Sequence, residues 1–220
     1  MAICTRRFFR RVHHSSPLLA LLAALLVVPS FAQQLQPIPL PKPQITGGMP
    51  LMQALAQRHT TRVFDDKDLP IQTLSNLLWA AFGVNRPRAT MPTLGRTAPS
   101  GMNSQDVELD VILPAGVYVY DAEQNLLRPI ATGDLRAAML TAPQAHAPVT
   151  ILYTTDAKAT FAQVDNGFIG QNVYLFAASE GLNAWFYTVR ADRITAALKL
   201  PATRLPLYAQ SVGYPPAPSK

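Results

Sequence analysis

The chain has 220 residues, which is enough for one domain with a substantial core, and its formal net charge is +6. Four of its 19 basic residues, Arg6, Arg7, Arg10 and Arg11, lie in an N-terminal segment without acidic residues. Residues 33–220 keep 15 basic against 13 acidic side chains, a net charge of +2. A balance this close to neutral argues against a nucleic-acid-binding protein.

Residues 1–32 have the three parts of an export signal: a basic start, an apolar run over 18–28, and small residues at Ser30 and Ala32 that fit a cleavage site. The apolar run is short for a membrane span. Residues 5–11, Thr-Arg-Arg-Phe-Phe-Arg-Arg, resemble the twin-arginine motif that directs folded proteins to export. We therefore expect a cleaved signal peptide, a periplasmic protein and no stable membrane span after cleavage. An ordinary Sec signal is the alternative.

The remaining chain offers little for metal binding or covalent catalysis. Cys4 is the only cysteine and would leave with the signal, so no disulfide and no thiol nucleophile are expected. Only His59 and His146 follow the signal, which argues against a zinc site built from histidines. No phosphate-binding loop, dinucleotide fingerprint, nucleophile elbow or metalloprotease motif is present. The sequence therefore predicts no metal site and no catalytic residue of the protein's own.

The segment after the signal is rich in proline. Residues 33–48 carry four prolines at alternate positions and end in two glycines, which predicts an extended linker without a core of its own. Such a segment could wrap around a partner subunit. The sequence then predicts a folded domain over residues 49–215 and a tail over 216–220.

A short helix over residues 51–56 is predicted from its spaced apolar residues, and it leads into Arg58-His59-Thr60-Thr61-Arg62. Two guanidinium groups four residues apart, with hydroxyls between them, can direct charge-assisted hydrogen bonds at one phosphate. The sequence therefore predicts an anion site here. The alternative is a basic turn exposed to solvent.

The next stretches are a helix, a loop and a turn. Pro70 opens a helix whose apolar spacing runs over 71–82, and Gly83 stands at its C-terminal cap. Residues 85–97 predict a long loop. In residues 99–105 a Pro-Ser-Gly sequence makes a turn whose backbone N–H groups can face outward, and the amide of Asn103 can donate and accept.

Strands and helices alternate along the rest of the chain. Residues 107–111 predict a half-buried strand, 117–120 with 126–130 a hairpin, and 148–153 a strand buried in the middle of a sheet. Helices are expected over 134–140, over 168–179, which is apolar on nearly all faces, and over 193–200 after a capping Asp192, before a last strand over 207–212. This order predicts an α+β domain with a central, mostly antiparallel or mixed sheet flanked by helices.

Five short motifs in this order resemble the FMN-dependent nitroreductase family, from about residue 50 to residue 215. They are Arg-His-Thr-Thr-Arg with Phe64, Pro-Ser-Gly-Met-Asn-Ser-Gln at 99–105, Leu-Trp-Ala-Ala-Phe-Gly at 78–83, Arg-Thr-Ala-Pro-Ser at 96–100 and Gly-Val-Tyr-Val-Tyr at 116–120. Within the family, the last three of these motifs are most similar to the branch that also holds azoline-oxidising dehydrogenases of peptide maturation.

The resemblance implies a homodimer that binds FMN. On this basis Arg58, His59, Thr60 and Arg62 are candidates to hold the FMN phosphate. The resemblance assigns Pro99, Ser100, Gly101 and Asn103 to the edge of the flavin ring across the subunit interface. It also implies a loop after Gly181-Leu182 whose backbone approaches flavin N5, with Phe186 and Tyr187 as the candidate residues there.

The implied activity is that of an oxidoreductase working by a ping-pong scheme, in which NAD(P)H or another donor reduces the flavin and a nitro, quinone-like or other oxidised organic acceptor reoxidises it. Two alternatives share this fold. One is an azoline-type dehydrogenase acting on a peptide. The other is a protein that binds flavin or a partner without catalysis.

Overall fold

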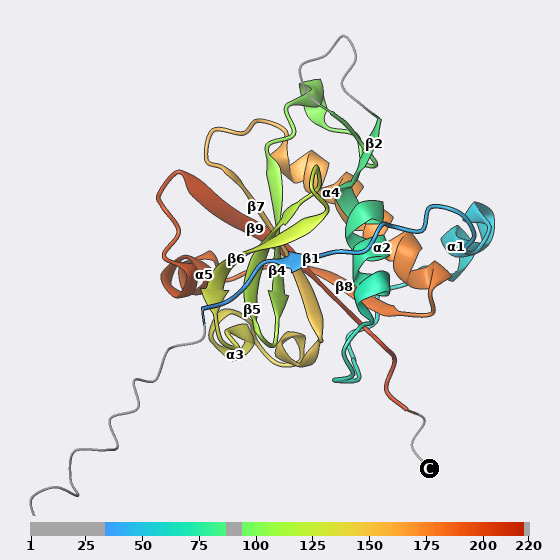
Figure 1. Cartoon of the computed structure of the whole chain (residues 1–220). Coiled ribbons are helices and arrows are strands. Elements are labelled where there is room, and N and C mark those ends of the chain that lie inside the picture. The colour runs from blue at the N-terminus through green and yellow to red at the C-terminus, as the bar shows by residue number, and fades with distance from the viewer. Residues whose placement is uncertain (1–33, 87–93, 218–220) are drawn as a thin grey trace, which may run out of the picture. The chain divides into compact units, whose positions relative to one another are not determined.

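The computed structural model describes residues 34–86 and 94–217, shown in colour in Figure 1. The predicted signal peptide, part of the predicted 85–97 loop and the end of the predicted tail therefore lie outside the described residues. The described residues from Leu35 onward form one compact unit.

A seven-stranded sheet organises the fold, with the strand order β1-β6-β5-β4-β7-β9-β8 and antiparallel pairing between all neighbours. The strands are β1 (Ile38–Pro39), β4 (Val107–Leu113), β5 (Gly116–Asp121), β6 (Leu126–Thr132), β7 (Val149–Asp156), β8 (Asn183–Thr188) and β9 (Arg204–Gly213). Two short strands, β2 (Val84–Arg86) and β3 (Gly95–Arg96), form a separate ribbon.

Helices cover both faces of the sheet (Figure 1). They are α1 (Leu51–Gln57), α2 (Ile71–Phe82), α3 (Arg136–Met139), α4 (Ala162–Ser179) and α5 (Ala191–Leu198), with 3-10 turns at Gly101–Asn103 and Gln144–His146. Side chains of α2 and α4 pack into one core cluster, and those of α3 and α5 pack into the other. The predicted α+β fold, with a mostly antiparallel sheet flanked by helices, is confirmed.

The middle strand of the sheet divides its side chains between the two clusters. Ile151 and Tyr153 of β7 belong to the cluster under α2 and α4, whereas Leu152 belongs to the cluster under α3 and α5. All three are fully buried. This is the continuous apolar strand that the sequence predicts at 148–153, because a strand with helices on both faces needs apolar residues at successive positions.

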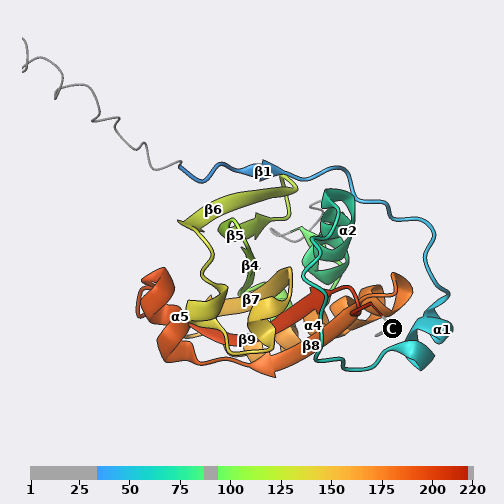
Figure 2. The same cartoon turned by 90° about the horizontal axis from the view of Figure 1, so that it is seen from below.

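The segment 35–48, predicted to be a linker, packs against the domain and is called the N-terminal strap here. It adds the edge strand β1 to β6 and passes over α2 to α1, as Figure 2 shows. Leu40 is buried, Ser75 Oγ donates to the carbonyl oxygen of Pro41 at 2.5 Å, and Asn125 Nδ2 donates to the same oxygen at 2.8 Å. The alternating prolines suit an extended path, while side chains far along the chain supply the hydrogen bonds.

The main differences from the sequence prediction concern α4, the segment 183–188 and Asp192. α4 begins at Ala162 rather than at 168, and it is not buried all round, since Phe168 is 42% exposed. Residues 183–188 form the edge strand β8, not a loop, because β9 supplies a ladder partner along the whole segment. Asp192 lies inside the first turn of α5 and does not cap it; it forms an ion pair with Arg190, which precedes the helix.

Candidate functional site

The Arg58–Arg62 segment leaves α1 and runs beside the edge strand β8. α1 ends at Gln57, and Arg58 already has an extended conformation. The backbone N–H of Thr61 donates to the carbonyl oxygen of Ala184 at 3.0 Å, and Asn183 Nδ2 donates to that of Val63 at 2.8 Å. The sheet edge therefore fixes the backbone on which the two arginines stand.

Tyr174 of α4 connects this segment to β8, a role that no sequence motif indicates. Its hydroxyl lies 3.0 Å from Thr60 Oγ1 and accepts a 2.9 Å hydrogen bond from the backbone N–H of Phe186. The guanidinium carbon of Arg58 lies 5.4 Å from the Tyr174 ring centre. One tyrosine thus positions Arg58, Thr60 and the middle of β8 together.

Both arginines rest on aromatic rings. The guanidinium carbon of Arg62 lies 5.3 Å from the Trp185 ring centre. Among residues 34–86 and 94–217, neither Arg58 nor Arg62 forms an ion pair. Their forks are therefore available to an anion, with Thr60 between them. His59 is exposed, and its Nδ1 lies 2.7 Å from the carbonyl oxygen of Gln57, so its ring turns toward the end of α1.

The loop at residues 99–105, called the 99–105 loop here, is attached to the first turn of α4 by Asp165. The fully buried Asp165 accepts hydrogen bonds from Ser100 Oγ at 2.7 Å and from the backbone N–H of Gly101 at 2.9 Å. A Cβ atom at Gly101 would collide with the Phe161 ring. The close approach to α4 therefore requires glycine at this position.

Gln105 closes the same loop from the other side. Its backbone N–H donates to Ser100 Oγ at 2.8 Å, and its side-chain Nε2 donates to Asn103 Oδ1 at 3.0 Å and to the carbonyl oxygen of Leu94 at 2.6 Å. Met102, Asn103 and Gln105 all have φ between +53° and +55°, a region that non-glycine residues seldom occupy. Local strain of this kind persists only where surrounding bonds impose it.

We expect the exchange Gln105→Ala to lower the free energy of unfolding by about 2–3 kcal/mol, because it removes bonds to Asn103, Leu94 and Arg96 that are each worth about 1 kcal/mol. Urea unfolding at neutral pH measures the change. Gln124→Ala, at an exposed glutamine in the β5–β6 turn, is the matched control and should cost less than about 0.5 kcal/mol. Equal losses in the two variants would mean that Gln105 does not hold the loop.

Phe186 and Tyr187 point to opposite faces of the sheet, as neighbours on a strand must. The Phe186 ring packs against Tyr153 and Tyr208, at centroid distances of 5.5 and 5.0 Å. The Tyr187 hydroxyl lies 2.9 Å from Ser211 Oγ on the other side. Burial raises the pKa of Tyr187 to about 12, so this phenol stays protonated at neutral pH. The side chains of Phe186 and Tyr187 therefore pack into the two core clusters, and the arginine segment is bordered by the backbone of β8 and by the side chains of Asn183 and Trp185.

The structure thus gathers the predicted site residues in two groups, both attached to α4. The first contains Arg58, Thr60 and Arg62 with the backbone of β8, and it meets α4 at Tyr174. The second contains Pro99, Ser100, Gly101 and Asn103, and it meets α4 at Asp165. Nine residues separate these two attachment points, which is about 13 Å along the helix axis. Within one chain the groups are therefore separate.

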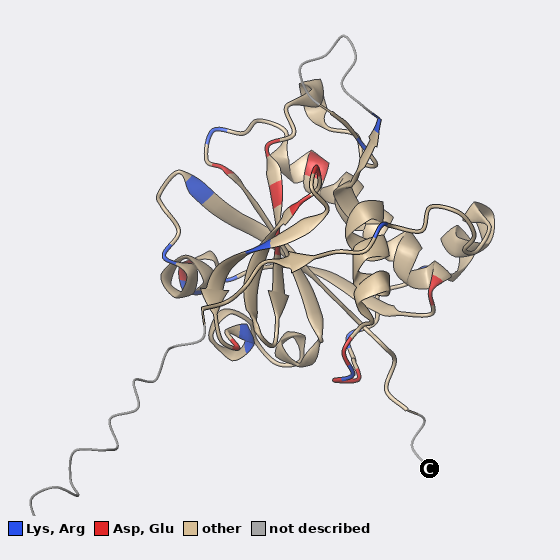
Figure 3. Cartoon of the chain, viewed as in Figure 1, with Lys and Arg blue, Asp and Glu red and all other residues tan. Residues whose placement is uncertain are grey.

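Basic and acidic residues are scattered over the described elements, and most of the ribbon carries neither (Figure 3). In residues 34–86 and 94–217 no three His, Cys, Asp or Glu side chains come close enough to hold a metal ion. No helix in the same residues is both long and apolar enough to cross a membrane.

Comparison with known proteins places this fold. The chain is 32% identical to a nitroreductase-like protein of Ralstonia eutropha JMP134, over 82% of this chain and 90% of that one, with a TM-score of 0.73. It is 29% identical to a candidate nitroreductase of Methanocaldococcus jannaschii, over 60% of this chain and 75% of the relative. One chain of the Escherichia coli microcin synthetase McbBCD complex shares the fold, at 19% identity and a TM-score of 0.60, over 82% of this chain and 79% of that one.

The family model described as the nitroreductase family matches residues 55–214, which include both groups of site residues. The chain therefore belongs to the nitroreductase family.

Proposed function

We propose that this protein is an FMN-dependent oxidoreductase that acts as a homodimer. The observation that carries the proposal is the pair of arginines, Arg58 and Arg62, held on aromatic rings beside the edge strand β8 and forming no ion pair among the described residues. Two guanidinium forks around the hydroxyl of Thr60 suit a phosphate monoester dianion. The FMN phosphate is such a group, and when bound FMN supplies the hydride chemistry that no side chain of this protein can supply.

The dimer is proposed because the second group of site residues lies about 13 Å along α4 from the first. The surface beside the 99–105 loop is apolar and exposed: Met102 is 85%, Val164 53% and Phe168 42% exposed. Contiguous exposed apolar side chains of this kind mark interaction surfaces. A second copy packed there would cover them and bring its own 99–105 loop to the arginine segment of the first.

Within that dimer the loop would contribute mainly as a hydrogen-bond acceptor and through its backbone. The Ser100 hydroxyl already donates its hydrogen to Asp165, so toward a flavin edge it can only accept. Asp165 and Gln105 hold the loop shape before any ligand arrives, and a preformed loop loses less conformational entropy on binding. The outer edge of β8 is the part of the first subunit that would border the ring, apart from the N–H of Phe186 and the carbonyl of Ala184, which are already bonded to Tyr174 and Thr61.

Reductant and acceptor would use the same open face of the flavin in turn, which is a ping-pong scheme. We propose NAD(P)H or another hydride donor as the first substrate and a nitroaromatic or quinone as the second. Anaerobic mixing with NAD(P)H should bleach the visible flavin spectrum of the purified protein, and adding a quinone should restore it. A protein that stays colourless after incubation with FMN contradicts the proposal. Bound flavin without turnover by any donor and acceptor pair would show a binding protein instead.

A further inference from the structure

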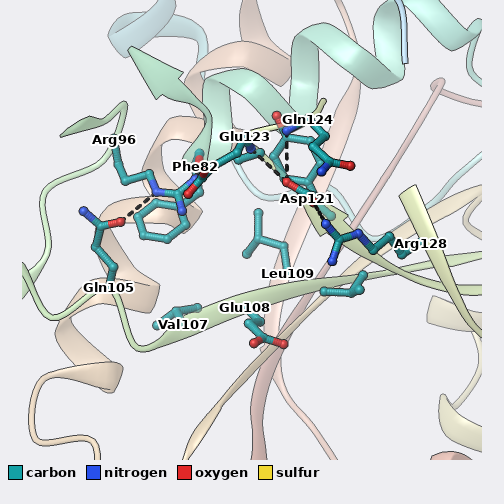
Figure 4. A pocket seen from close by; sticks show the side chains of 13 residues that line it. Phe82, Arg96, Gln105, Val107, Glu108, Leu109, Asp121, Glu123, Gln124 and Arg128 are labelled. Atoms are coloured by element: carbon teal, nitrogen blue, oxygen red, sulfur yellow. Dashed lines mark hydrogen bonds and ion pairs between the residues drawn. The ribbon is translucent and has the colours of Figure 1, made fainter. Parts of the chain in front are cut away.

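A cavity lies away from the arginine segment, between β4, the β5–β6 hairpin and the end of α2 (Figure 4). Its volume is about 540 Å³, within the range of small-molecule sites, roughly 300–1,000 Å³. The buried side chains of Phe82, Val107, Leu109 and Tyr120 form its apolar wall. Arg96 and Gln105 supply polar groups at one end.

The cavity exists because β4 is longer than its pairing with β5. β4 pairs with β7 from Val107 to Ile112, but with β5 only from Asp110 to Leu113. Residues 107–109 therefore present a strand edge that lies outside the β5 ladder and borders the cavity. Backbone N–H and C=O groups on such an edge readily pair with an amide of a ligand.

Arg96 is the cation that this cavity offers. Its Nε donates to Gln105 Oε1 at 2.9 Å, its Nη1 lies 3.4 Å from the carbonyl oxygen of Phe82, and its guanidinium carbon lies 5.1 Å from the centre of the Phe82 ring. Within the described residues Nη2 has no hydrogen-bond partner. Burial lowers the pKa of Arg96, the mark of a desolvated cation. A guanidinium in this state binds a carboxylate more strongly than one in water.

Three of the other charged groups around the cavity, Arg128, Asp121 and Glu108, are engaged in ion pairs. Arg128 forms an ion pair with Asp121. The carboxylate of Glu108 forms one with Arg204 and points away from Phe82 and Leu109 in Figure 4. Glu123 is exposed and attracts Arg96 electrostatically, but it forms no ion pair with it. Among the described residues, Arg96 is thus the cavity's one cation without a carboxylate partner.

We infer that this cavity binds a small organic carboxylate with an apolar body and a neighbouring amide, of the class of N-acylated apolar amino acids. The carboxylate would lie on the Nη edge of Arg96, the apolar group against Phe82 and Leu109, and the amide along the free edge of residues 107–109. The site shares Gln105 with the 99–105 loop but contains none of the residues proposed to bind flavin, and the inference does not depend on that function.

Isothermal titration of the protein as purified tests this with four matched probes. N-acetyl-phenylalanine carries all three features, N-acetyl-phenylalaninamide lacks the carboxylate, 3-phenylpropionate lacks the amide, and N-acetylglycine lacks the apolar group. We expect N-acetyl-phenylalanine to bind best and its amide at least about tenfold more weakly, since a hydrogen bond to a charged group is worth about that factor or more. The other two probes should also bind more weakly, because 3-phenylpropionate loses the amide contact and N-acetylglycine loses the buried apolar group. Equal binding of the acid and its amide, or no binding at millimolar concentration, overturns the inference.

Variants locate the binding. Arg96→Gln should weaken N-acetyl-phenylalanine at least about tenfold and leave the binding of its amide unchanged, whereas Arg193→Gln, at an exposed arginine of α5, should change neither. Saturation with FMN should leave the affinity unaltered. Competition between FMN and the probe, or full binding by a folded Arg96→Gln protein, places the probe elsewhere and refutes the site. The probe series on the unaltered protein decides the question if Arg96→Gln does not fold.

Discussion

Exchanging Arg58 and Arg62 together for glutamine is expected to weaken FMN binding by at least about a hundredfold, so that the purified protein loses its yellow colour. A hydrogen bond to a charged group contributes about 1.5–3 kcal/mol, and each 1.4 kcal/mol is a factor of ten in affinity. Losing two such groups from one phosphate should therefore lower the affinity for FMN by more than two orders of magnitude. Glutamine keeps a similar length and a hydrogen-bond donor, so the loss reports on charge and fork geometry.

The measurement is a fluorescence titration of flavin into the variant after removal of bound cofactor. Arg86→Gln with Arg193→Gln is the matched control, because both of these arginines are exposed and lie on other elements. That pair should keep the affinity of the unaltered protein. Thermal unfolding should shift little in either protein, since an exposed cation–π contact is worth only about 0.5–1 kcal/mol. A stable Arg58/Arg62 variant that retains its full flavin content contradicts the assignment of the phosphate site.

Exchanging Arg58 or Arg62 alone for glutamine should lower the affinity for FMN by different amounts. Arg58 is half-buried against Tyr174, and Arg62 is exposed beside Trp185. Salt screens exposed charges more strongly than sheltered ones. The contribution of Arg62 should therefore fall faster than that of Arg58 as ionic strength rises, and titrations at low and high salt separate the two.

The order of helices and strands could be predicted because their signals are local. The apolar spacing of α2 and the unbroken apolar run of β7 each need only their own residues. β8 was expected to be a loop, although Trp185, Phe186 and Tyr187 alternate between faces as a strand requires. Its ladder with β9 and its contact with the 58–63 segment join residues far apart in sequence, and no local pattern shows such partners.

The residues that hold the candidate site together were also beyond the sequence. Asp165 is the only acidic residue of α4. Only the fold shows that it accepts a hydrogen bond from Ser100 of the 99–105 loop, which lies 65 residues earlier in the chain. Tyr174 reaches Thr60 across 114 residues. The prolines of the N-terminal strap predict that it is extended, but they do not indicate which residues an extended segment contacts. The motif residues could be predicted because they follow one another in short patterns. The residues that hold them in place, such as Asp165 and Tyr174, are far from them in the sequence.

The second large effect is expected on the free energy of unfolding, when the buried carboxyl of Asp110 is replaced. Asp110 lies in β4 with only 2% of its surface exposed, and Thr154 Oγ1 donates to its Oδ2 at 3.0 Å. Arg204 Nε donates to the same Thr154 oxygen at 3.1 Å, so the threonine hydrogen must point toward Asp110. Burial raises the pKa of Asp110 to about 7, and the attraction of Arg204 only partly opposes it. The carboxyl is thus neutral in the fold over a range in which it is ionised when the chain unfolds.

We therefore expect Asp110→Asn to stabilise the protein at pH 8 but not at pH 4. Above pH 4 the unfolded state releases the Asp110 proton while the folded state keeps it, so the stability of the unaltered protein falls as pH rises toward 7. One pKa unit corresponds to about 1.4 kcal/mol, which puts the advantage of the variant at pH 8 at about 4 kcal/mol or less. The asparagine oxygen can accept the same Thr154 hydrogen bond, so little is lost. Urea unfolding at both pH values measures the difference, with Asp66→Asn, an exposed aspartate, as the control. An advantage of equal size at both pH values would show that the carboxyl of Asp110 ionises in the fold as easily as in water.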